Sequence, residues 1–199
     1  MTMSKGICVV IIGVVGSGKT TVIRRLSEVL PDAVMMRTFT TRALRPGEAE
    51  NGDRYSLSRE EFERRVADGE MIEWDEHFGF LYGSSSKLLD ELLERHQVVL
   101  ANVNYVGARA FQNKVPNVLT VFLSVPLDQN IDRIRQRGKM TERELALRLD
   151  AVKDEIASAG EFDFIVDNPD GGLDRAVERI REIILERLKS FNDDRSHVR

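Results

Sequence analysis

The chain has 199 residues, 42% of them hydrophobic, which is enough to bury the core of one domain. Its formal net charge of −4 excludes a general basic surface for the backbone of a nucleic acid, so anions must be bound by a local cluster of cations. The single cysteine, Cys8, excludes a disulfide framework or a metal site of several cysteines, and we expect it in the core.

The first predicted element is a buried strand over Ile7–Ile12, formed by six consecutive apolar residues. This run is too short to span a membrane, and no small-residue cleavage site follows it. We therefore expect a soluble, cytoplasmic protein.

Directly after this strand, residues 13–20 read GVVGSGKT and match the phosphate-loop pattern G-x-x-x-x-G-K-[ST]. Glycines let successive backbone N–H groups point inward, and the helix that follows directs the positive end of its dipole at a bound phosphate. Lys19 is placed to reach the β- and γ-phosphates, and the Thr20 hydroxyl to hold Mg²⁺. We expect Lys19 to face solvent until a nucleotide binds. The predicted triphosphate-binding residues are Gly13, Val14, Val15, Gly16, Ser17, Gly18, Lys19 and Thr20.

Continuous apolar runs recur along the chain, with amphipathic helical patterns between them. Strands are expected at residues 33–36, 98–103, 118–125 and 164–166. Helical stripes are expected at Val22, Ile23, Leu26, Val29 and Leu30, and at Val177, Ile180, Ile184 and Leu188. Because the strand runs do not alternate with polar residues, both faces of the sheet should be covered. The pattern predicts an α/β fold with a mostly parallel sheet and helices on both faces.

Two charged stretches interrupt this alternation. In the first, about residues 38–95, Arg42 and Arg45 lie in a loop rich in turn formers and could hold an acceptor phosphate between them, although a solvated basic loop remains the alternative. A capping box at Ser58 and Glu61 predicts a short helix that ends near Gly69, and a hairpin is expected around Gly79.

The second charged stretch, about residues 128–150, predicts two short helices joined at Gly138, the second with a capping box at Thr141. Its residues Arg133, Arg137 and Arg148 could clamp a triphosphate, whereas an arginine-rich helix by itself is usually only a solvated face. After this stretch the chain ends in a polar tail at residues 192–199, which we expect to be frayed.

Several separately spaced segments resemble the guanylate kinase family. They are TFTTRALRPGE at residues 38–48 with Gly52 and Tyr55, the REEF helix with Phe62, the IEW segment with Glu73, and the YGS segment at residues 82–84. The similarity continues through Arg133, Arg137, Arg148 and Asn168, and it covers the chain from Lys5 to about Leu188.

The resemblance implies a P-loop nucleoside monophosphate kinase that transfers the γ-phosphoryl group of ATP to GMP or dGMP, with Mg²⁺ as cofactor. It implies a P-loop NTPase-type sheet with an inserted monophosphate-binding subdomain and a short lid. The implied parts are a core of residues 1–37, 96–127 and 151–191, a GMP-binding subdomain of 38–95, a lid of 128–150, and the tail of 192–199.

The resemblance also implies roles for residues at matching positions. ATP would be bound by the phosphate loop, with Asn168 near the adenine. The acceptor phosphate would be bound by Arg42, Arg45, Tyr55 and Tyr82, and the base by Thr38, Glu73, Ser84 and Asn104. Catalysis would rest on Lys19, Arg42, Arg133, Arg137 and Arg148. Glu73 suits guanine, because a carboxylate can accept from the ring N–H and the exocyclic amine, a donor pair that adenine lacks. Taken alone, Glu73 would be interpreted as a surface charge and the tyrosines as packing aromatics.

The sequence departs from the family pattern at the end of the third predicted strand. Asn102 and Asn104 stand where the family usually has aspartates, the first near Mg²⁺ and the second near the guanine amine. Each asparagine keeps an acceptor oxygen but loses a negative charge. The loop at residues 48–55 is also one residue longer than usual, which puts Arg54 directly before Tyr55.

These departures leave alternatives open. The asparagines allow a kinase of a different nucleoside monophosphate or of a phosphorylated sugar. A non-catalytic guanylate kinase-like binding module is a further alternative, against which the retained Lys19 and lid arginines argue. The expected partners are ATP and a nucleoside monophosphate, with no nucleic acid or membrane, and the protein is expected to be a monomer or a small homo-oligomer.

Overall fold

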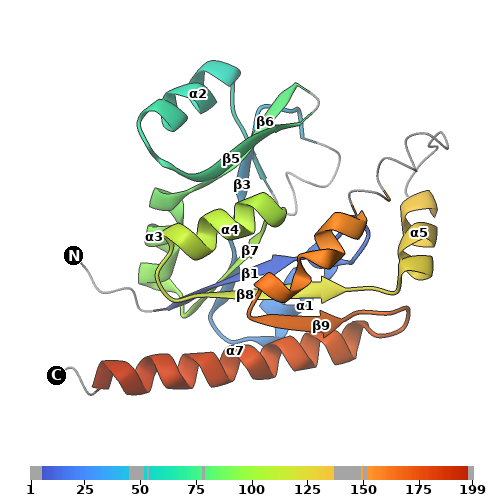
Figure 1. The fold of residues 1–199 in the computed structure, drawn as a ribbon. Coiled ribbons are helices and arrows are strands. Elements are labelled where there is room, and N and C mark those ends of the chain that lie inside the picture. Colours follow the sequence, from blue (N-terminus) through green and yellow to red (C-terminus); the bar gives the residue numbers. More distant parts are fainter. Residues whose placement is uncertain are drawn as a thin grey trace.

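The computed structural model describes residues 6–44, 52, 54–77, 79–136, 149 and 152–196. Its centre is a five-stranded sheet in the order β2-β7-β1-β8-β9, in which every neighbouring pair of strands is parallel (Figure 1). The strands are β1 (Ile7–Ile12), β2 (Ala33–Met35), β7 (Val98–Asn102), β8 (Val118–Ser124) and β9 (Phe164–Asp167). Each matches a predicted strand to within one residue at either end, so the α/β fold with a parallel sheet is confirmed.

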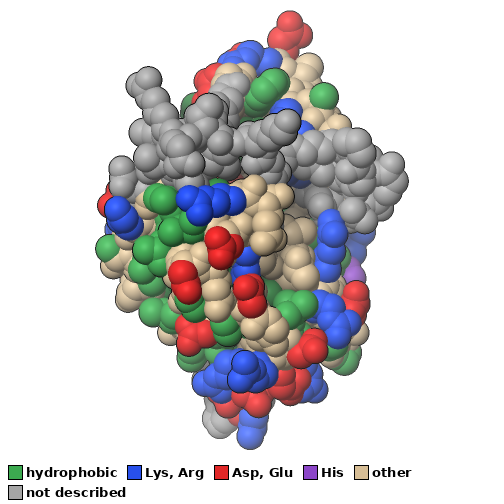
Figure 2. Space-filling model, turned by 90° about the vertical axis from the view of Figure 1, so that its right-hand side faces the viewer, with side chains coloured by type: hydrophobic (Ala, Val, Ile, Leu, Met, Phe, Trp, Pro, Cys, Tyr) green, Lys and Arg blue, Asp and Glu red, His purple; other side chains and the backbone are tan. Residues whose placement is uncertain are grey.

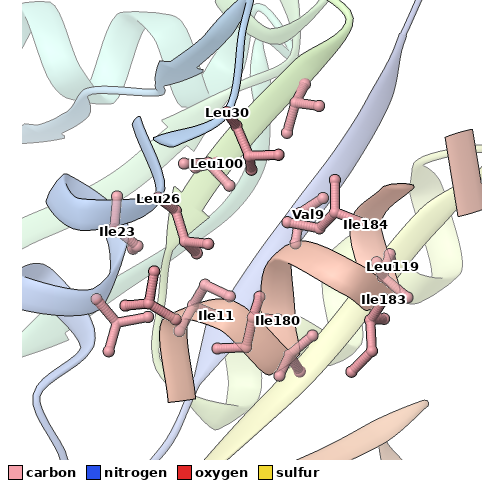
Figure 3. Packing of buried hydrophobic residues seen from close by; sticks show 14 of the residues in the cluster. Val9, Ile11, Ile23, Leu26, Leu30, Leu100, Leu119, Ile180, Ile183 and Ile184 are labelled. Carbon is pink, nitrogen blue, oxygen red and sulfur yellow. The ribbon is translucent and has the colours of Figure 1, made fainter. Parts of the chain in front are cut away.

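Helices cover both faces of this sheet, because alternate residues of a strand point in opposite directions. Val9 and Ile11 of β1 pack against one pair of helices, as Figure 3 shows, while Cys8 and Val10 pack on the opposite side. The first pair is α1 (Lys19–Val29) and α7 (Leu173–Ser196); the other side has α3 (Ser86–Arg95), α4 (Tyr105–Lys114) and α5 (Leu127–Gln136). Cys8 is fully buried, as expected from its place in the first apolar run.

Two details of the predicted helices differ in the structure. Val29 lies at the end of α1 and is 37% exposed, because the helix ends there and Leu30, its C-cap, turns into the core instead. Helix α7 runs through Ser196, so part of the tail that was expected to be frayed is helical. The residues after Phe191 include no glycine or proline that would end a helix.

A second sheet lies beside the first, with its strands in the order β4-β3-β6-β5 (Figure 1). Its elements are β3 (Thr38–Thr40), β4 (Arg54–Ser56), α2 (Arg59–Ala67), β5 (Met71–His77) and β6 (Phe80–Ser85). The predicted hairpin is confirmed as β5 and β6, which pair antiparallel around Gly79, a residue with φ +78°. The predicted cap is also present, since the Ser58 hydroxyl accepts a hydrogen bond from the Glu61 backbone N–H at 3.1 Å.

The second sheet has a small core of its own and is joined to the first by α4. Phe39, Phe62 and Leu81 are buried together between α2 and the strands. Helix α4 packs against β5, and Lys114 donates a hydrogen bond to the Ile72 carbonyl oxygen at 2.6 Å. The hairpin also lines a cavity together with Asn102 and the two residues after it, so it lies near the carboxyl-terminal edge of the parallel sheet, where ligands of open α/β sheets bind.

The surface at the carboxyl ends of the parallel strands carries charges of both signs. Figure 2 turns this side of Figure 1 to the viewer and shows basic and acidic side chains interspersed, without one continuous basic area among the described residues. None of the helices in the described ranges is both long and apolar enough to cross a membrane.

Candidate active site

The phosphate loop joins β1 to the N-terminus of α1 and requires glycine at its two ends. Gly18, the N-cap of α1, has φ +95°, and a Cβ there would lie 2.7 Å from the Asn168 side-chain nitrogen. Gly13 has φ +147°, and a Cβ there would lie 2.5 Å from the Leu123 carbonyl oxygen. Since real Cβ atoms do not approach other atoms so closely, only glycine lets the chain turn here and present the start of α1 to a phosphate.

Lys19 is bound to the phosphate loop in this structure. Its ammonium donates to the carbonyl oxygens of Gly13 at 2.5 Å and Val14 at 3.2 Å, and the side chain is half-buried. Lys19 is therefore partly exposed, and it lines a cavity beside the loop as well as bonding the loop itself. An ammonium group has three N–H donors, which lets Lys19 bond both loop carbonyls at once.

Asn168 and Arg133 form a second layer behind the loop. The buried Asn168 amide donates to the Ser17 carbonyl oxygen at 2.8 Å. Arg133 of α5 donates to the Asn168 carbonyl oxygen at 3.1 Å and to Asp170 at 2.7 Å. Asn168, predicted near the adenine of ATP, and Arg133, predicted as a catalytic arginine, therefore both lie directly beside the loop. They line a cavity of about 460 Å³ together with Gly16, Gly18, Thr21, Gln136, Pro169, Asp170, Gly171 and Leu173.

A second cavity, of about 380 Å³, lies between the phosphate loop and the small sheet. Segments from different parts of the chain enclose it: the loop, β3 and β4, the β5–β6 hairpin, the end of β7 with the two residues after it, and the helical segment that carries Glu155. Its lining is Gly13, Val15, Lys19, Thr38, Arg54, Glu73, Asp75, His77, Tyr82, Gly83, Asn102, Val103, Asn104 and Glu155. We call this space the acceptor cavity.

Glu73 is held in a fixed orientation inside the acceptor cavity. The buried Ser84 hydroxyl, opposite it on β6, donates a hydrogen bond to a Glu73 carboxylate oxygen at 2.7 Å. Burial raises the pKa of Glu73; the neighbouring Asp75 adds to this rise, and the hydrogen bond from Ser84 opposes it. When Glu73 is ionised, both of its carboxylate oxygens can only accept hydrogen bonds. The site therefore suits the edge of a ligand that carries N–H donors.

The two asparagines both make structural hydrogen bonds while lining the same cavity. The Asn102 amide donates to the Thr20 hydroxyl oxygen at 3.2 Å, which links the end of β7 to the phosphate loop. Asn104 is the N-cap of α4, and its side-chain oxygen accepts from the Gly107 backbone N–H at 2.8 Å. Asn102 thus lies beside Thr20, the predicted metal ligand. Asn104 lines the same cavity as Glu73, a residue of the predicted base site.

The predicted acceptor-phosphate residues are less closely gathered. Tyr82 lines the cavity, with the Arg54 guanidinium 5.3 Å from the centre of its ring. Tyr55 lies outside that lining and stacks on Phe39, with ring centres 5.3 Å apart. Arg42 also lies outside the lining and donates to the Ala43 carbonyl oxygen at 2.6 Å. The remaining predicted site residues Arg45, Arg137 and Arg148, and the predicted cap at Thr141, lie outside the described residues.

Sequence reasoning missed several residues of the acceptor cavity. Asp75 and His77 follow Glu73 at every second position of β5, so the alternation of a strand could have placed all three on one face. Glu155, in the helical residues 152–157, reaches the cavity from far along the chain, and no local pattern marks it. Burial raises the pKa of Glu155, and the nearby charge of Lys19 opposes that rise.

Comparison with known proteins identifies the family of the chain. A family model described as guanylate kinase matches residues 5–187. The chain is 38% identical to a guanylate kinase of Corynebacterium jeikeium over 185 residues, which are 92% of this chain and 97% of that one. It is 36% identical to a guanylate kinase of Rubrobacter xylanophilus over 183 residues, 92% of this chain and 95% of that one. A crystal structure of guanylate kinase from Anaplasma phagocytophilum superposes with a TM-score of 0.71 at 28% identity, covering 92% of this chain and 86% of that one. Since these matches span nearly the whole chain, the protein belongs to the guanylate kinase family.

Proposed function

We propose that this protein transfers the γ-phosphoryl group of ATP to GMP, giving ADP and GDP. The observation that carries the proposal is that Lys19 of the phosphate loop and Glu73 of the hairpin line one cavity. Lys19 supports binding of the phosphate that is transferred, and the Glu73–Ser84 pair supports recognition of guanine. A nucleotide bound between them would direct its phosphate toward the loop.

The proposed reaction is a direct in-line transfer. An oxygen of the GMP phosphate attacks the γ-phosphorus, the bond from that phosphorus to the β–γ bridging oxygen breaks, and ADP leaves with the electron pair. Negative charge is crowded at this moment, so cations stabilise it. The proposed cations are Lys19, Arg42, Arg45, Arg133, Arg137 and Arg148, with Tyr55 and Tyr82 as further donors to the acceptor phosphate.

Mg²⁺ is the proposed cofactor, and the residues beside the loop fit it. The Thr20 hydroxyl and the Asn102 amide are neighbours, and a half-turn of that amide would present an oxygen in place of its nitrogen. Mg²⁺ takes oxygen ligands and usually needs only one or two from the protein, because waters and substrate phosphates supply the rest. Thr20 and Asn102 would hold the ion, which would supply positive charge against the negative charge that develops during transfer.

The first prediction tests the acceptor. We expect purified protein with ATP and Mg²⁺ to release ADP much faster with GMP than with AMP, CMP or UMP, because only guanine offers two adjacent N–H donors to Glu73. ADP release is measured with each monophosphate in turn, with and without Mg²⁺. Equal rates with all four, or no stimulation by GMP, would contradict the proposed function.

The second prediction concerns Asn102, whose side chain bonds the Thr20 hydroxyl. Replacing Asn102 with aspartate should lower the Mg²⁺ concentration needed for half-maximal ATP binding about fivefold or more, because a full negative charge near a divalent cation is worth at least ~1 kcal/mol. Calorimetric titration of ATP at a series of Mg²⁺ concentrations measures this.

Asn104→Asp is the matched control for that change. It adds the same charge to the same cavity, but at the cap of α4, where the side chain bonds Gly107 and not Thr20. It should therefore leave the Mg²⁺ requirement of ATP binding close to that of the unchanged protein. An equal effect of both substitutions would show that net charge alone is responsible. No effect of Asn102→Asp would remove Asn102 from the metal site.

A further inference from the structure

Strand β5 presents a row of three titratable side chains to the acceptor cavity. Glu73, Asp75 and His77 occupy alternate positions and all line this space. The intervening residues face away: Trp74 is 50% exposed, and Glu76 forms an ion pair with Arg59 at 2.8 Å. The proposed function uses only the first residue of the row.

The register of the hairpin relates the three side chains of this row to the proposed positions of the base and the acceptor phosphate. Glu73 is opposite Ser84, and Asp75 is opposite Tyr82. The base is proposed to bind at Glu73 and Ser84, and the acceptor phosphate near Tyr82. Alternate residues of a strand are ~6.6 Å apart, so Asp75 lies one such step from the base site. In a nucleoside monophosphate the sugar follows the base, so it lies about one such step from Glu73, beside Asp75. The phosphate lies beyond the sugar, toward the hydroxyl at the end of the longer Tyr82 side chain.

The Asp75 carboxylate is oriented by its neighbours and keeps capacity to accept. One oxygen accepts from the Glu76 backbone N–H at 2.7 Å, and the other lies 2.9 Å from Nε2 of His77. An ionised carboxylate offers about four acceptor positions and no donor. A ligand group beside it must therefore be a donor, and among the parts of a nucleotide near this position the sugar hydroxyls are donors whereas the phosphate is an anion.

We propose that Asp75 accepts a hydrogen bond from the 2′-hydroxyl of the acceptor ribose and so makes the site prefer GMP over dGMP. The inference rests on the proposed function, which it extends from the base to the sugar. A carboxylate that binds a ribose 2′-hydroxyl is a known solution in dinucleotide-binding folds, where it has the same chemical purpose. Glu73 selects the base, and Asp75 selects the sugar.

The test compares GMP with dGMP. With the unchanged protein, kcat/KM for GMP should exceed that for dGMP by about tenfold, the usual effect of one hydrogen bond to a charged group. Asp75→Ala should lower kcat/KM for GMP about tenfold and leave that for dGMP nearly unchanged, so that the ratio approaches one. Asp75→Asn, which keeps the shape and one acceptor oxygen, should give an intermediate ratio. Dissociation constants of both nucleotides, measured by calorimetry, should change in the same way.

Glu76→Ala is the matched control, since it removes a carboxylate from the opposite face of the same strand and should leave the GMP-to-dGMP ratio unchanged. Equal losses for GMP and dGMP in Asp75→Ala would overturn the inference, as would an unchanged protein that does not distinguish the two. If Asp75→Ala turns over GMP normally and its ratio of kcat/KM for GMP to that for dGMP is unaltered, the role of Asp75 is overturned while the proposed function stands. Absence of GMP binding and turnover in the unchanged protein overturns the proposed function and this inference together.

Discussion

Replacing Lys19 with alanine is expected to reduce kcat with ATP and GMP by about 10²- to 10³-fold, the usual loss when one charge-stabilising donor is removed from a transition state. Lys19 is the first residue of α1 and lines the acceptor cavity next to the loop that binds the donor phosphates. Its ammonium group can follow the γ-phosphoryl group as that group moves from ADP to the acceptor. Steady-state ADP release at saturating GMP and Mg²⁺ measures the loss.

The same substitution should leave the fold intact. The Lys19 ammonium group bonds the carbonyl oxygens of Gly13 and Val14, whereas the residues of α1 that pack on the sheet are Val22, Ile23 and Leu26. We therefore expect thermal unfolding of the free variant within a few degrees of the unchanged protein. The rise in Tm on adding ATP should be smaller in the variant, because at a given ligand concentration the stabilisation increases with the logarithm of the affinity.

Lys87→Ala serves as the control for Lys19→Ala. Lys87 is an exposed lysine in the first turn of α3, and its removal takes away the same charge from a similar helical position. It should leave turnover unchanged. Activity of Lys19→Ala within a few-fold of the unchanged protein, or a Lys19→Ala variant that simply unfolds, would contradict the role assigned to Lys19.

Replacing Glu73 with glutamine is expected to lower kcat/KM for GMP by about 10²-fold, because one of two carboxylate acceptors becomes an N–H donor that opposes a donor of guanine. The Ser84 hydroxyl can still donate to the remaining amide oxygen, so the side chain should keep its place. Turnover with AMP, CMP and UMP should change little. Initial rates with all four monophosphates give the comparison, and an unchanged base preference would remove Glu73 from the site.

The dependence on pH provides a second measure of Glu73. Burial raises its pKa above the usual range for glutamate, and the ionised form is the one that accepts from guanine. As pH falls through this raised pKa, kcat/KM for GMP should fall. Glu73→Gln should remove that part of the profile and leave any contribution of Glu155, the other cavity carboxyl whose pKa is raised by burial. A profile that Glu73→Gln does not alter would show that another group controls acceptor binding.

The folding stability of the free protein should respond to ionisation of Glu73 in the opposite direction from GMP binding: ionisation favours binding but opposes folding. A group whose pKa is higher in the folded than in the unfolded state favours folding below its unfolded pKa, and this contribution is lost as pH rises through the folded pKa. At neutral pH the buried Glu73 charge therefore opposes folding in the free protein. Glu73→Gln should unfold at the same temperature as the unchanged protein or a slightly higher one, which excludes misfolding as the cause of its lost activity.

Features that depend only on neighbours along the chain could be predicted from the amino-acid sequence. The apolar runs predicted all five strands of the parallel sheet. The glycine pattern predicted the loop from Gly13 to Thr20 between the first strand and the helix after it. The cap at Ser58 and the hairpin around Gly79 were predicted as well. Each of these is encoded within a few residues, by an uninterrupted apolar segment, a glycine at a turn or a hydroxyl before a helix. The roles of the site residues and the boundaries of subdomain and lid stay predictions.

How these segments meet could not be predicted from local sequence, because it depends on contacts between distant parts of the chain. Strands β3 and β4 have three residues each, too few for a periodic pattern, and they exist through pairing with each other and, for β3, with β6. The acceptor cavity brings Lys19 together with Asp75 and Glu155, residues far apart in sequence. Asn102 reaches Thr20 only because β7 lies beside β1 in the sheet. Such contacts follow from the docking of one sheet on another, which depends on the packing of both cores at once and which no short stretch of sequence encodes.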